Sequence, residues 1–440
     1  MTTAPHLVTA MAIASCLITP FTSRADTAKA PDESVLGTII VDGSADTQVP
    51  PPKLAVMPFS STDTVDVTSR SVVKRDLDLV GLYTVVEESA MPAGPFAHDT
   101  EVDPKVWQAK GIAYLVRVYA TGGPAKFSVV GEAWVLSKGK DALFSEKMDA
   151  TTTDVRLVGH KMTDAILGAI TGRKGGFASR MAFSGKTGKG RQIFTIDADG
   201  QSPTAVSPAP TVTGDAALAP AFGPDNEIYY ALSKSYGPFQ LVRSESAKAV
   251  DVGLPGSVLG IGFSPDRSKV ALAVMTDASS KIYVGKSVAG ATPISGLTAQ
   301  KTEPFANHPV LGPLGKMAYV GGKDVPRVYV DGSAVSPAGF HASSPVFCDA
   351  PQGLLVIFTV TVGNGADLIA TDTSGGNLRR LTQGQGQNAF PACSPDGRMV
   401  GFFSTGKSAK GPGLYVLPIG APHRLQRIAT ETGESLTWVR

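Results

Sequence analysis

The chain has 440 residues, long enough for two or three domains with sizeable cores. Apolar residues make up 42% and charged residues only 18%, and there are 48 glycines and 32 prolines, a mixture typical of many short strands and turns. The formal net charge of +2 gives no support for a nucleic-acid partner.

Residues 1–25 are predicted to be a signal peptide. The stretch 7–21 is apolar but short for a membrane span, and Ser23-Arg24-Ala25 places small residues at the two positions that a signal peptidase reads. The alternative is the lipobox-like run 13–16, which would make Cys16 a lipidated N-terminus. Both alternatives predict that the mature protein works outside the cytoplasm.

Residues 26–52 are predicted to be a flexible tail. They are polar and end in three prolines, which disfavour a helix and a central strand alike. Inside the tail, residues 38–41 (TIIV) form an extended, β-branched patch, and the turn-prone pair Asp42-Gly43 follows. The alternative is that the tail is a plain spacer left after export.

Residues 53–174 are predicted to form an α/β domain. Val65, Val72, Val73 and Leu77 fit one face of a helix that Gly81 ends. A closing helix is expected at 154–170, because its apolar residues recur every three and four positions. Strands are expected at 54–57, 83–86, 112–119, 127–136 and 143–148, with a short helix at 102–110.

Residues 177–440 consist of short apolar strands and turns that repeat. The sequence 219–225 (APAFGPD) recurs at 260–266 (GIGFSPD) and at 390–397 (FPACSPDG), with weaker copies elsewhere. The central residues of the copies, here called the repeat centres, lie 36 to 48 residues apart. They are Phe222, Phe263, Leu311, Phe347, Cys393 and Trp438. This period predicts an all-β six-bladed β-propeller, whose last strand completes the first blade.

The stretch Gly401 to Ser408 (GFFSTGKS) fits the pattern of a phosphate-binding loop. Such a loop needs a strand before it and a helix after it, so that helix amides point at the anion. Here a strand is expected at 399–403, but a Gly/Pro turn and a second strand follow. We therefore expect a hairpin and no nucleotide.

Other residues that could carry chemistry are explained more simply. Cys348 and Cys393 are predicted to be two buried thiols, with one disulfide as the alternative. The six histidines have no metal-ligand spacing, and no Gly-x-Ser-x-Gly elbow is present. Asp225, Asp266 and Asp396 follow prolines in the repeats, where Asp caps its own turn. We expect no enzyme, no cofactor and no metal site.

Several local signatures resemble the TolB family, the periplasmic component of the Tol–Pal system of Gram-negative envelopes. The resemblance covers 38–440 and is most specific at the junction of the two predicted domains. The matching positions are His160, Asp164, Ile166, Thr171-Gly172, Gly175, Phe177 and Arg180-Met-Ala-Phe183, with Leu54-Ala-Val-Met-Pro-Phe59 and Ile40-Val41-Asp42-Gly43 upstream.

The resemblance implies a periplasmic adaptor that supports outer-membrane integrity and envelope constriction in cell division. Its propeller would bind the peptidoglycan-associated lipoprotein, Pal, through Ser257, Gly260, Asn307 and His308, which match by repeat position and not by residue identity. Its tail would bind TolA through a short extended stretch. The residues of that stretch are Ile39, Ile40, Val41, Asp42 and Gly43. The alternative is a secreted propeller that binds or cleaves a small ligand, such as a glycan, in its central channel.

Overall fold

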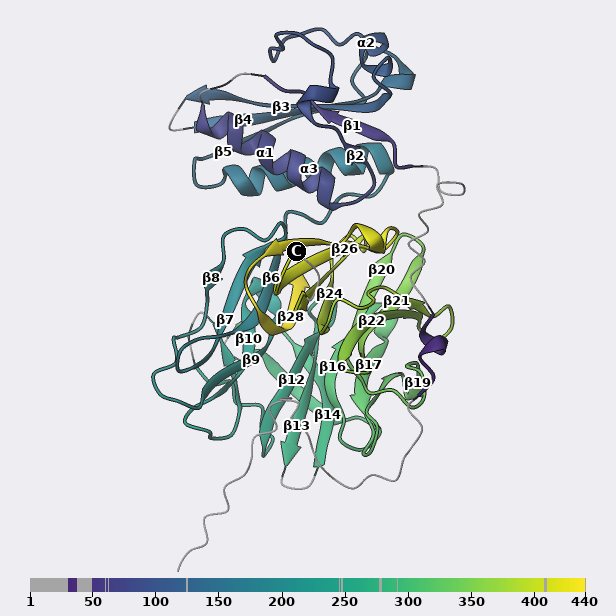
Figure 1. The fold of residues 1–440 in the computed structure, drawn as a ribbon. Helices are drawn as coiled ribbons and strands as arrows, with labels where there is room; N and C mark the ends of the chain where they lie inside the picture. The colour runs from purple at the N-terminus through teal and green to yellow at the C-terminus, as the bar shows by residue number, and fades with distance from the viewer. Residues whose placement is uncertain are drawn as a thin grey trace, which may run out of the picture.

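The computed structural model describes most of the chain. The described residues are 31–37, 50–59, 61, 63–123, 126–244, 246, 248–276, 279–290, 292–406 and 410–439. Strands dominate, and the described helices are few (Figure 1). None of these helices has the length and apolar character needed to cross a membrane.

The N-terminal part holds a five-stranded sheet with the order β2-β1-β3-β4-β5. β1 pairs parallel with β2 and β3, and the remaining pairs are antiparallel. The strands are β1 (Lys53–Val56), β2 (Thr84–Val85), β3 (Ile112–Gly123), β4 (Lys126–Val135) and β5 (Phe144–Ala150). The helices are α1 (Thr64–Leu79), α2 (Pro104–Gln108) and α3 (Val155–Thr171), with short 3-10 turns η2 (Glu88–Ala90) and η3 (Leu136–Lys138).

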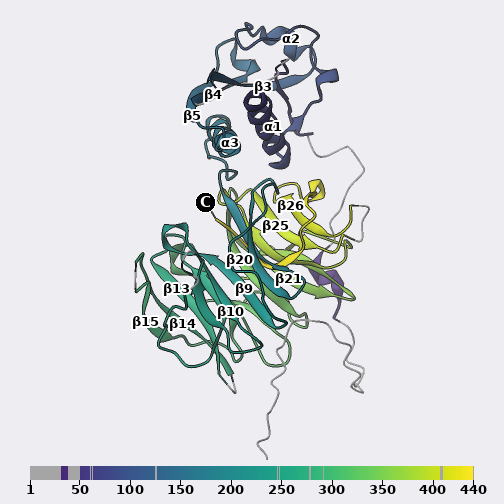
Figure 2. The ribbon, with the colours of Figure 1, turned by 90° about the vertical axis from the view of Figure 1, so that its left-hand side faces the viewer.

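Local sequence sets the ends of the two long helices. The Asp63 carboxylate accepts a hydrogen bond from the Val65 N–H at 2.8 Å and caps α1. α3 ends at Gly172, which adopts a left-handed conformation with φ of 78° that suits glycine. The expected helical residues Val73 and Leu77 are buried in a cluster with residues of the sheet, and Val72 is buried beside Gly159 of α3. Figures 1 and 2 show α1 and α3 between this sheet and the C-terminal sheets.

After Arg180 the chain forms antiparallel sheets. The first has the order β11-β10-β9-β7-β6-β28, with β8 beside β7. Its strands are β6 (Arg180–Lys186), β7 (Gly190–Asp197), β8 (Thr204–Ala205), β9 (Asp215–Phe222), β10 (Ile228–Ser233), β11 (Gln240–Arg243) and β28 (Gly433–Val439). It consists of two antiparallel groups joined by a short parallel pairing of β7 with β9.

Four four-stranded sheets follow, each with its strands in sequence order. They are β12 (Ser257–Phe263), β13 (Lys269–Thr276), β14 (Ser279–Ser287), β15 (Ile294–Ala299); β16 (Asn307–Leu311), β17 (Met317–Gly321), β18 (Arg327–Val330), β19 (Ser333–Ala334); β20 (Ala342–Ala350), β21 (Gly353–Val362), β22 (Gly365–Asp372), β23 (Arg379–Arg380); and β24 (Asn388–Cys393), β25 (Met399–Ser404), β26 (Gly413–Pro418), β27 (Gln426–Ala429).

The last strand returns to the first of this region, as the sequence predicted. β28 pairs antiparallel with β6, and Trp438 lies opposite Met181. This pairing removes an open sheet edge, which would otherwise invite association with another chain.

The prediction of two free thiols is wrong. Cys348 in β20 and Cys393 in β24 form a disulfide across a sequence separation of 45 residues, with a Cα–Cα distance of 5.4 Å. The inner strands β20 and β24 of neighbouring sheets lie side by side, which brings the two cysteines together, and sequence spacing alone did not reveal this.

The phosphate-loop pattern has the context that the sequence predicted. β25 covers Met399–Ser404 and the next element is strand β26, so no described helix follows the pattern to offer amides to an anion. Lys407 and Ser408 lie outside the described residues.

Candidate functional site

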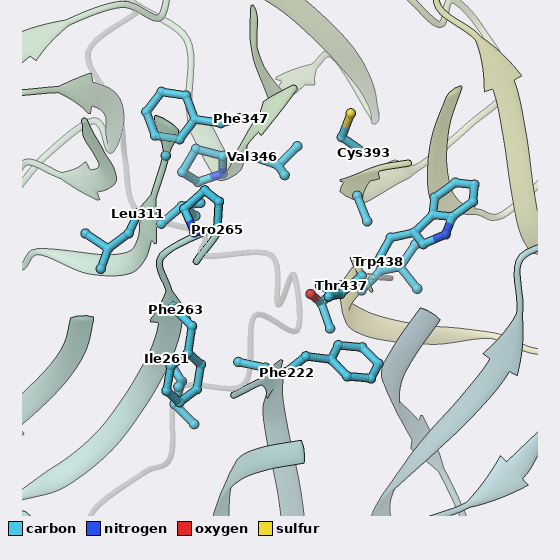
Figure 3. Close-up of a pocket in the computed structure, with 18 of the residues that line it drawn as sticks. Phe222, Ile261, Phe263, Pro265, Leu311, Val346, Phe347, Cys393, Thr437 and Trp438 are labelled. Atoms are coloured by element: carbon cyan, nitrogen blue, oxygen red, sulfur yellow. The ribbon is translucent and has the colours of Figure 1, made fainter. Parts of the chain in front are cut away.

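A cavity of about 520 Å³ lies where the inner strands of the sheets meet. All six repeat centres line it, so residues spread over more than 200 positions of sequence converge on one space. Figure 3 shows Phe222, Phe263, Phe347 and Trp438 around this space, with Leu311 and Cys393 between them. The repeat centres, which can be recognised in the sequence, are therefore residues of the cavity wall.

The backbone beside the cavity is bent at one repeated position. The residue three places before a repeat centre has a positive φ in five of the six copies. These residues are Ala219 (50°), His308 (46°), Ser344 (50°), Phe390 (56°) and Ser435 (55°), and Gly260 holds the sixth place. The strand register shifts near each of these positions, which is the mark of a β-bulge. Positive φ is costly for residues other than glycine, so the packing of the sheets must hold these bulges in place.

Two of the four residues predicted to bind a partner on the propeller line the cavity. Gly260 lies so close to the next sheet that a Cβ on it would approach Pro309 Cδ at 2.9 Å. Burial lowers the pKa of His308, and its Nδ1 has no hydrogen-bond partner among the described residues. His308 therefore brings an imidazole nitrogen without a described partner to the cavity lining.

The other two predicted residues lie at strand starts outside the cavity lining. The Ser257 Oγ accepts a hydrogen bond from the Phe239 N–H at 3.3 Å. The Asn307 Nδ2 donates to the Phe305 carbonyl at 3.4 Å, while its Oδ1 is buried without a partner among the described residues. The predicted tail residues Ile39, Ile40, Val41, Asp42 and Gly43 lie outside the described residues.

The cavity wall is mainly apolar, which bears on the ligand-binding alternative. A glycan site or hydrolase in the channel would need several polar and acidic side chains converging on the axis. Among the described residues that line the cavity, Asp349 is the one carboxylate, and it also accepts a hydrogen bond from Arg173 Nη2 at 3.0 Å. The lining fits contact with apolar groups better than chemistry on a sugar.

Exposed apolar side chains lie on several connections of the sheets, and some of them are at the end that faces away from α1 and α3. The lower ends of β12 and β13 lie at this end in Figure 1, where Ser257 pairs with Met275. Loops and strand ends here expose Tyr236 (62%), Met275 (40%), Phe305 (41%) and Val325 (37%). We call these four residues the apolar rim. Single exposed apolar residues are ordinary, and a contiguous group of them would mark a contact surface.

A buried polar cluster joins the N-terminal helices to the first C-terminal sheet. His160 Nδ1 lies 2.8 Å from the Asp76 Oδ2, and Arg156 Nη2 donates to the Asp199 carboxylate at 2.7 Å. Arg75 Nη2 donates to the Asp199 carbonyl at 2.7 Å. Sequence analysis missed this cluster, because its members come from α1, α3 and the turn after β7.

Asp76, His160 and Asp199 could be read as a metal site, since their ligand atoms lie within 4.8 Å of one another. The two oxygens of Asp199, however, already accept from Arg156 and from the Gln201 N–H at 3.1 Å. The Arg75 Nε lies 3.5 Å from the same carboxylate. Two guanidinium groups neutralise this carboxylate and would repel a cation, so the arrangement fits an ion-paired contact between two parts of the chain.

A second set of polar contacts binds residues 171–174, which connect α3 to the C-terminal sheets. Arg398 is buried and pairs with Asp396 at 2.9 Å. Its guanidinium also donates to Thr171 Oγ1 at 2.7 Å and to the carbonyls of Arg173 and Lys174 at 2.8 and 3.1 Å. The one intact Ser-Pro-Asp-Gly copy therefore contacts the residues that follow α3.

Comparison with known proteins supports the resemblance found in the sequence. Residues 38–141 match the TolB amino-terminal domain. The chain is 30% identical over 180 residues to the Tol-Pal system protein TolB of Methylococcus capsulatus, a match that covers 39% of this chain and 40% of that protein. It is 31% identical over 195 residues to the same-named protein of Xanthomonas oryzae pv. oryzae, with 43% and 42% covered. The matched region thus spans less than half the length of these curated relatives.

A solved structure extends the likeness to most of the fold. The crystal structure of TolB from Acinetobacter baumannii has a TM-score of 0.69 at 21% identity and covers 88% of this chain and 96% of that one. At this identity the likeness concerns the fold. The resemblance to TolB is thus confirmed, and its family-model match covers residues 38–141.

Proposed function

We propose that this protein is a periplasmic adaptor of a Tol–Pal envelope complex. It is exported by a signal peptide at 1–25, contains an α/β domain at 53–174, and has a six-bladed propeller at 177–440. The propeller docks Pal, and the tail at 26–52 binds TolA, so that the complex supports outer-membrane integrity and envelope constriction. The protein acts by binding and not by catalysis.

The convergence of the six repeat centres on one apolar cavity carries the propeller part of this proposal. The first sheet divides into two groups of strands at the parallel pairing of β7 with β9, and the four later sheets bring the number of groups to six. β28 closes the arrangement by pairing with β6. One four-stranded sheet cannot bury both faces, whereas sheets packed around an axis can.

The apolar rim supports the docking of a protein partner at the end of the propeller. Phe305 lies two positions before the predicted contact residue Asn307, and the two are hydrogen-bonded. Its φ of 58° holds the side chain on a strained turn. Aromatic side chains that a partner desolvates are the usual source of affinity in protein interfaces.

The experiment is a binding titration of purified Pal with the Phe305→Asp variant. A charge at a desolvated aromatic contact costs about 2 kcal/mol or more, so we expect binding to weaken at least tenfold. Leu143→Asp is the matched control, because Leu143 is also 41% exposed but lies in the N-terminal part. Equal affinity of both variants and the wild type would rule out this docking face, and no binding of Pal to the wild type would rule out the proposed partner.

The tail is tested separately with TolA. Removal of residues 26–50 should abolish TolA binding while Pal still binds at the propeller. If the truncated chain bound TolA as tightly as the whole protein, the tail would be only a spacer.

A further inference from the structure

Neighbouring sheets of the C-terminal part touch at a position that recurs. In two pairs of sheets, the residue after one repeat centre is a glycine that lies against the ring of the next repeat centre. A Cβ on Gly223 would lie 3.0 Å from Phe263 Cζ, and one on Gly312 would lie 2.7 Å from Phe347 Cε2. At both places the glycine leaves room for the ring, so the two inner strands pack without a covalent bond.

The same position between β20 and β24 holds the disulfide. Cys348 is the residue after the repeat centre Phe347, and Cys393 is the next repeat centre. Cys348 is 0% exposed and Cys393 is 9% exposed. In Figure 3 the Cys393 sulfur, in yellow, points away from Thr437 and from the middle of the cavity. In the finished fold, both sulfurs are therefore closed to a reagent as large as a folded protein.

Part of the cover over the disulfide comes from strands that follow Cys393 in the chain. The two cysteines belong to an apolar cluster with Phe402 of β25 and Tyr415 of β26. The segment between the cysteines holds the rest of one sheet, β21 to β23, so the two thiols can meet as soon as β24 packs on β20. A disulfide forms by attack of a thiolate on another disulfide, at a rate that depends on access to the sulfur. Such a reagent therefore has to act before β25 and β26 pack over the pair.

We propose that Cys348 and Cys393 are the substrate of an exported thiol–disulfide oxidoreductase, which joins them before β25 and β26 cover the pair. One cysteine thiolate attacks the disulfide of the enzyme and forms a mixed disulfide, and the second cysteine thiolate then displaces the enzyme. The two cysteines are oxidised, and the enzyme leaves as a dithiol that carries the two protons. The inference rests on the proposed export for the place of the reaction, because disulfides persist outside the cytoplasm. The order of events does not depend on export.

The sealing of the disulfide is tested by reduction with dithiothreitol in the full-length chain that carries Cys16→Ser. Alkylation of the freed thiols, followed by mass spectrometry, gives the rate. Because the bond is buried, we expect reduction in native buffer to be at least tenfold slower than in urea. Equal rates in the two solvents would overturn the sealing.

The order of events is tested by refolding the reduced Cys16→Ser chain from urea, with oxidised glutathione as the probe. We expect the disulfide to form at least tenfold more slowly when glutathione is added after folding than when it is present from the start. A reduced chain that folds only once glutathione is added also places the bond first. If the folded, reduced chain gained the bond as fast as the unfolded one, oxidation before closure would be wrong.

The role of an enzyme is tested by expressing the whole chain in bacteria with and without their periplasmic thiol oxidase. We expect the bonded form in the periplasmic fraction to fall at least tenfold in the strain that lacks the oxidase. The control Cys348→Ala/Cys393→Ala should reach the same amount in both strains. Equal proportions of bonded protein in the two periplasmic fractions would overturn the role of the enzyme. Free thiols in both strains, with the chain in the cytoplasmic fraction, would mean that the proposed export fails while the order of events stands.

Discussion

At the scale of single residues, the repeated Ser-Pro-Asp sequence caps an exposed turn in one copy and joins two parts of the chain in another. Asp266 is exposed in its turn, where hydrogen bonds from Ser264 and Ser268 lower its pKa to about 2. Asp396 accepts the equivalent bonds from Ser394 and the Arg398 N–H, but it is buried and also pairs with the Arg398 guanidinium. The prediction that these aspartates cap turns is confirmed for both, whereas the junction role of Asp396 depends on which residues pack against it.

His160 gives a prediction on pH dependence. Burial tends to lower the pKa of His160, but the facing carboxylates of Asp76 and Asp199 outweigh it and raise the pKa above 6.5. A raised histidine pKa stabilises the fold below pH 6.5, and this contribution disappears as pH rises through the folded-state pKa. We expect the free energy of unfolding to fall between pH 6 and pH 8, by about 1.4 kcal/mol for each unit by which the pKa is raised.

The measurement is urea unfolding across this pH range. His160→Gln should lose most of the slope of stability against pH. His341→Gln is the control, because His341 is exposed, and it should keep the slope. Parallel slopes for all three proteins would show that the Asp76–His160 pair does not control the pH dependence.

At the scale of elements, much of the order of helices and strands could be predicted. The expected helix at 154–170 is α3, Val155–Thr171, and the expected strand at 127–136 is β4, Lys126–Val135. Apolar periodicity and capping glycines act locally, so they can be read from one stretch of chain. The repeat centres were also recognisable, because each copy carries the same signal.

Contacts between elements could not be read in this way. Asp76 and His160 are 84 positions apart, and only the packing of α1 on α3 brings them together. The disulfide escaped prediction for the same reason: Cys348 follows a repeat centre and Cys393 is one, so their sequence context did not mark them as a pair. The predicted tail residues and propeller contact residues remain predictions.

The disulfide gives a prediction for the strands β20 and β24. It closes a loop of 45 residues, and the loss of chain entropy in the unfolded state corresponds to about 4 kcal/mol of stabilisation. The double variant Cys348→Ala/Cys393→Ala should therefore lose roughly that amount in denaturant unfolding. Dithiothreitol should destabilise the wild type similarly and leave the double variant unchanged. A wild type that dithiothreitol does not affect would show that the disulfide contributes little.

At the scale of the whole molecule, polar contacts and a shared apolar cluster join the two parts of the chain, with Leu77 and Ile166 on one side and Ile428 and Trp438 on the other. Arg424 Nη1 donates to the carbonyls of Gly81 and Tyr83 at 3.0 and 2.9 Å, and Arg75 reaches the turn after β7. Each part also has its own apolar clusters, such as the one around Trp107 and Trp134 in the N-terminal part. Because each part keeps an apolar cluster of its own besides the shared one, we expect the two parts to unfold as separate units.

The three tryptophans make this separation measurable. Trp107 and Trp134 lie in the N-terminal part, whereas Trp438 in β28 is buried and its Nε1 donates to Ser179 Oγ at 2.8 Å. Trp438→Ala removes a large side chain at the strand that joins the last residues to β6, at a cost of about 3–5 kcal/mol. We expect the β-sheet circular dichroism signal to melt at a lower temperature in this variant, while the emission of Trp107 and Trp134 stays native through that transition.

The matched variant Trp107→Ala should destabilise the N-terminal part and leave the emission of Trp438 native. Coincident transitions in both variants would instead mean that the shared apolar cluster and the contacts of Arg75, Arg398 and Arg424 bind the two parts into one cooperative unit.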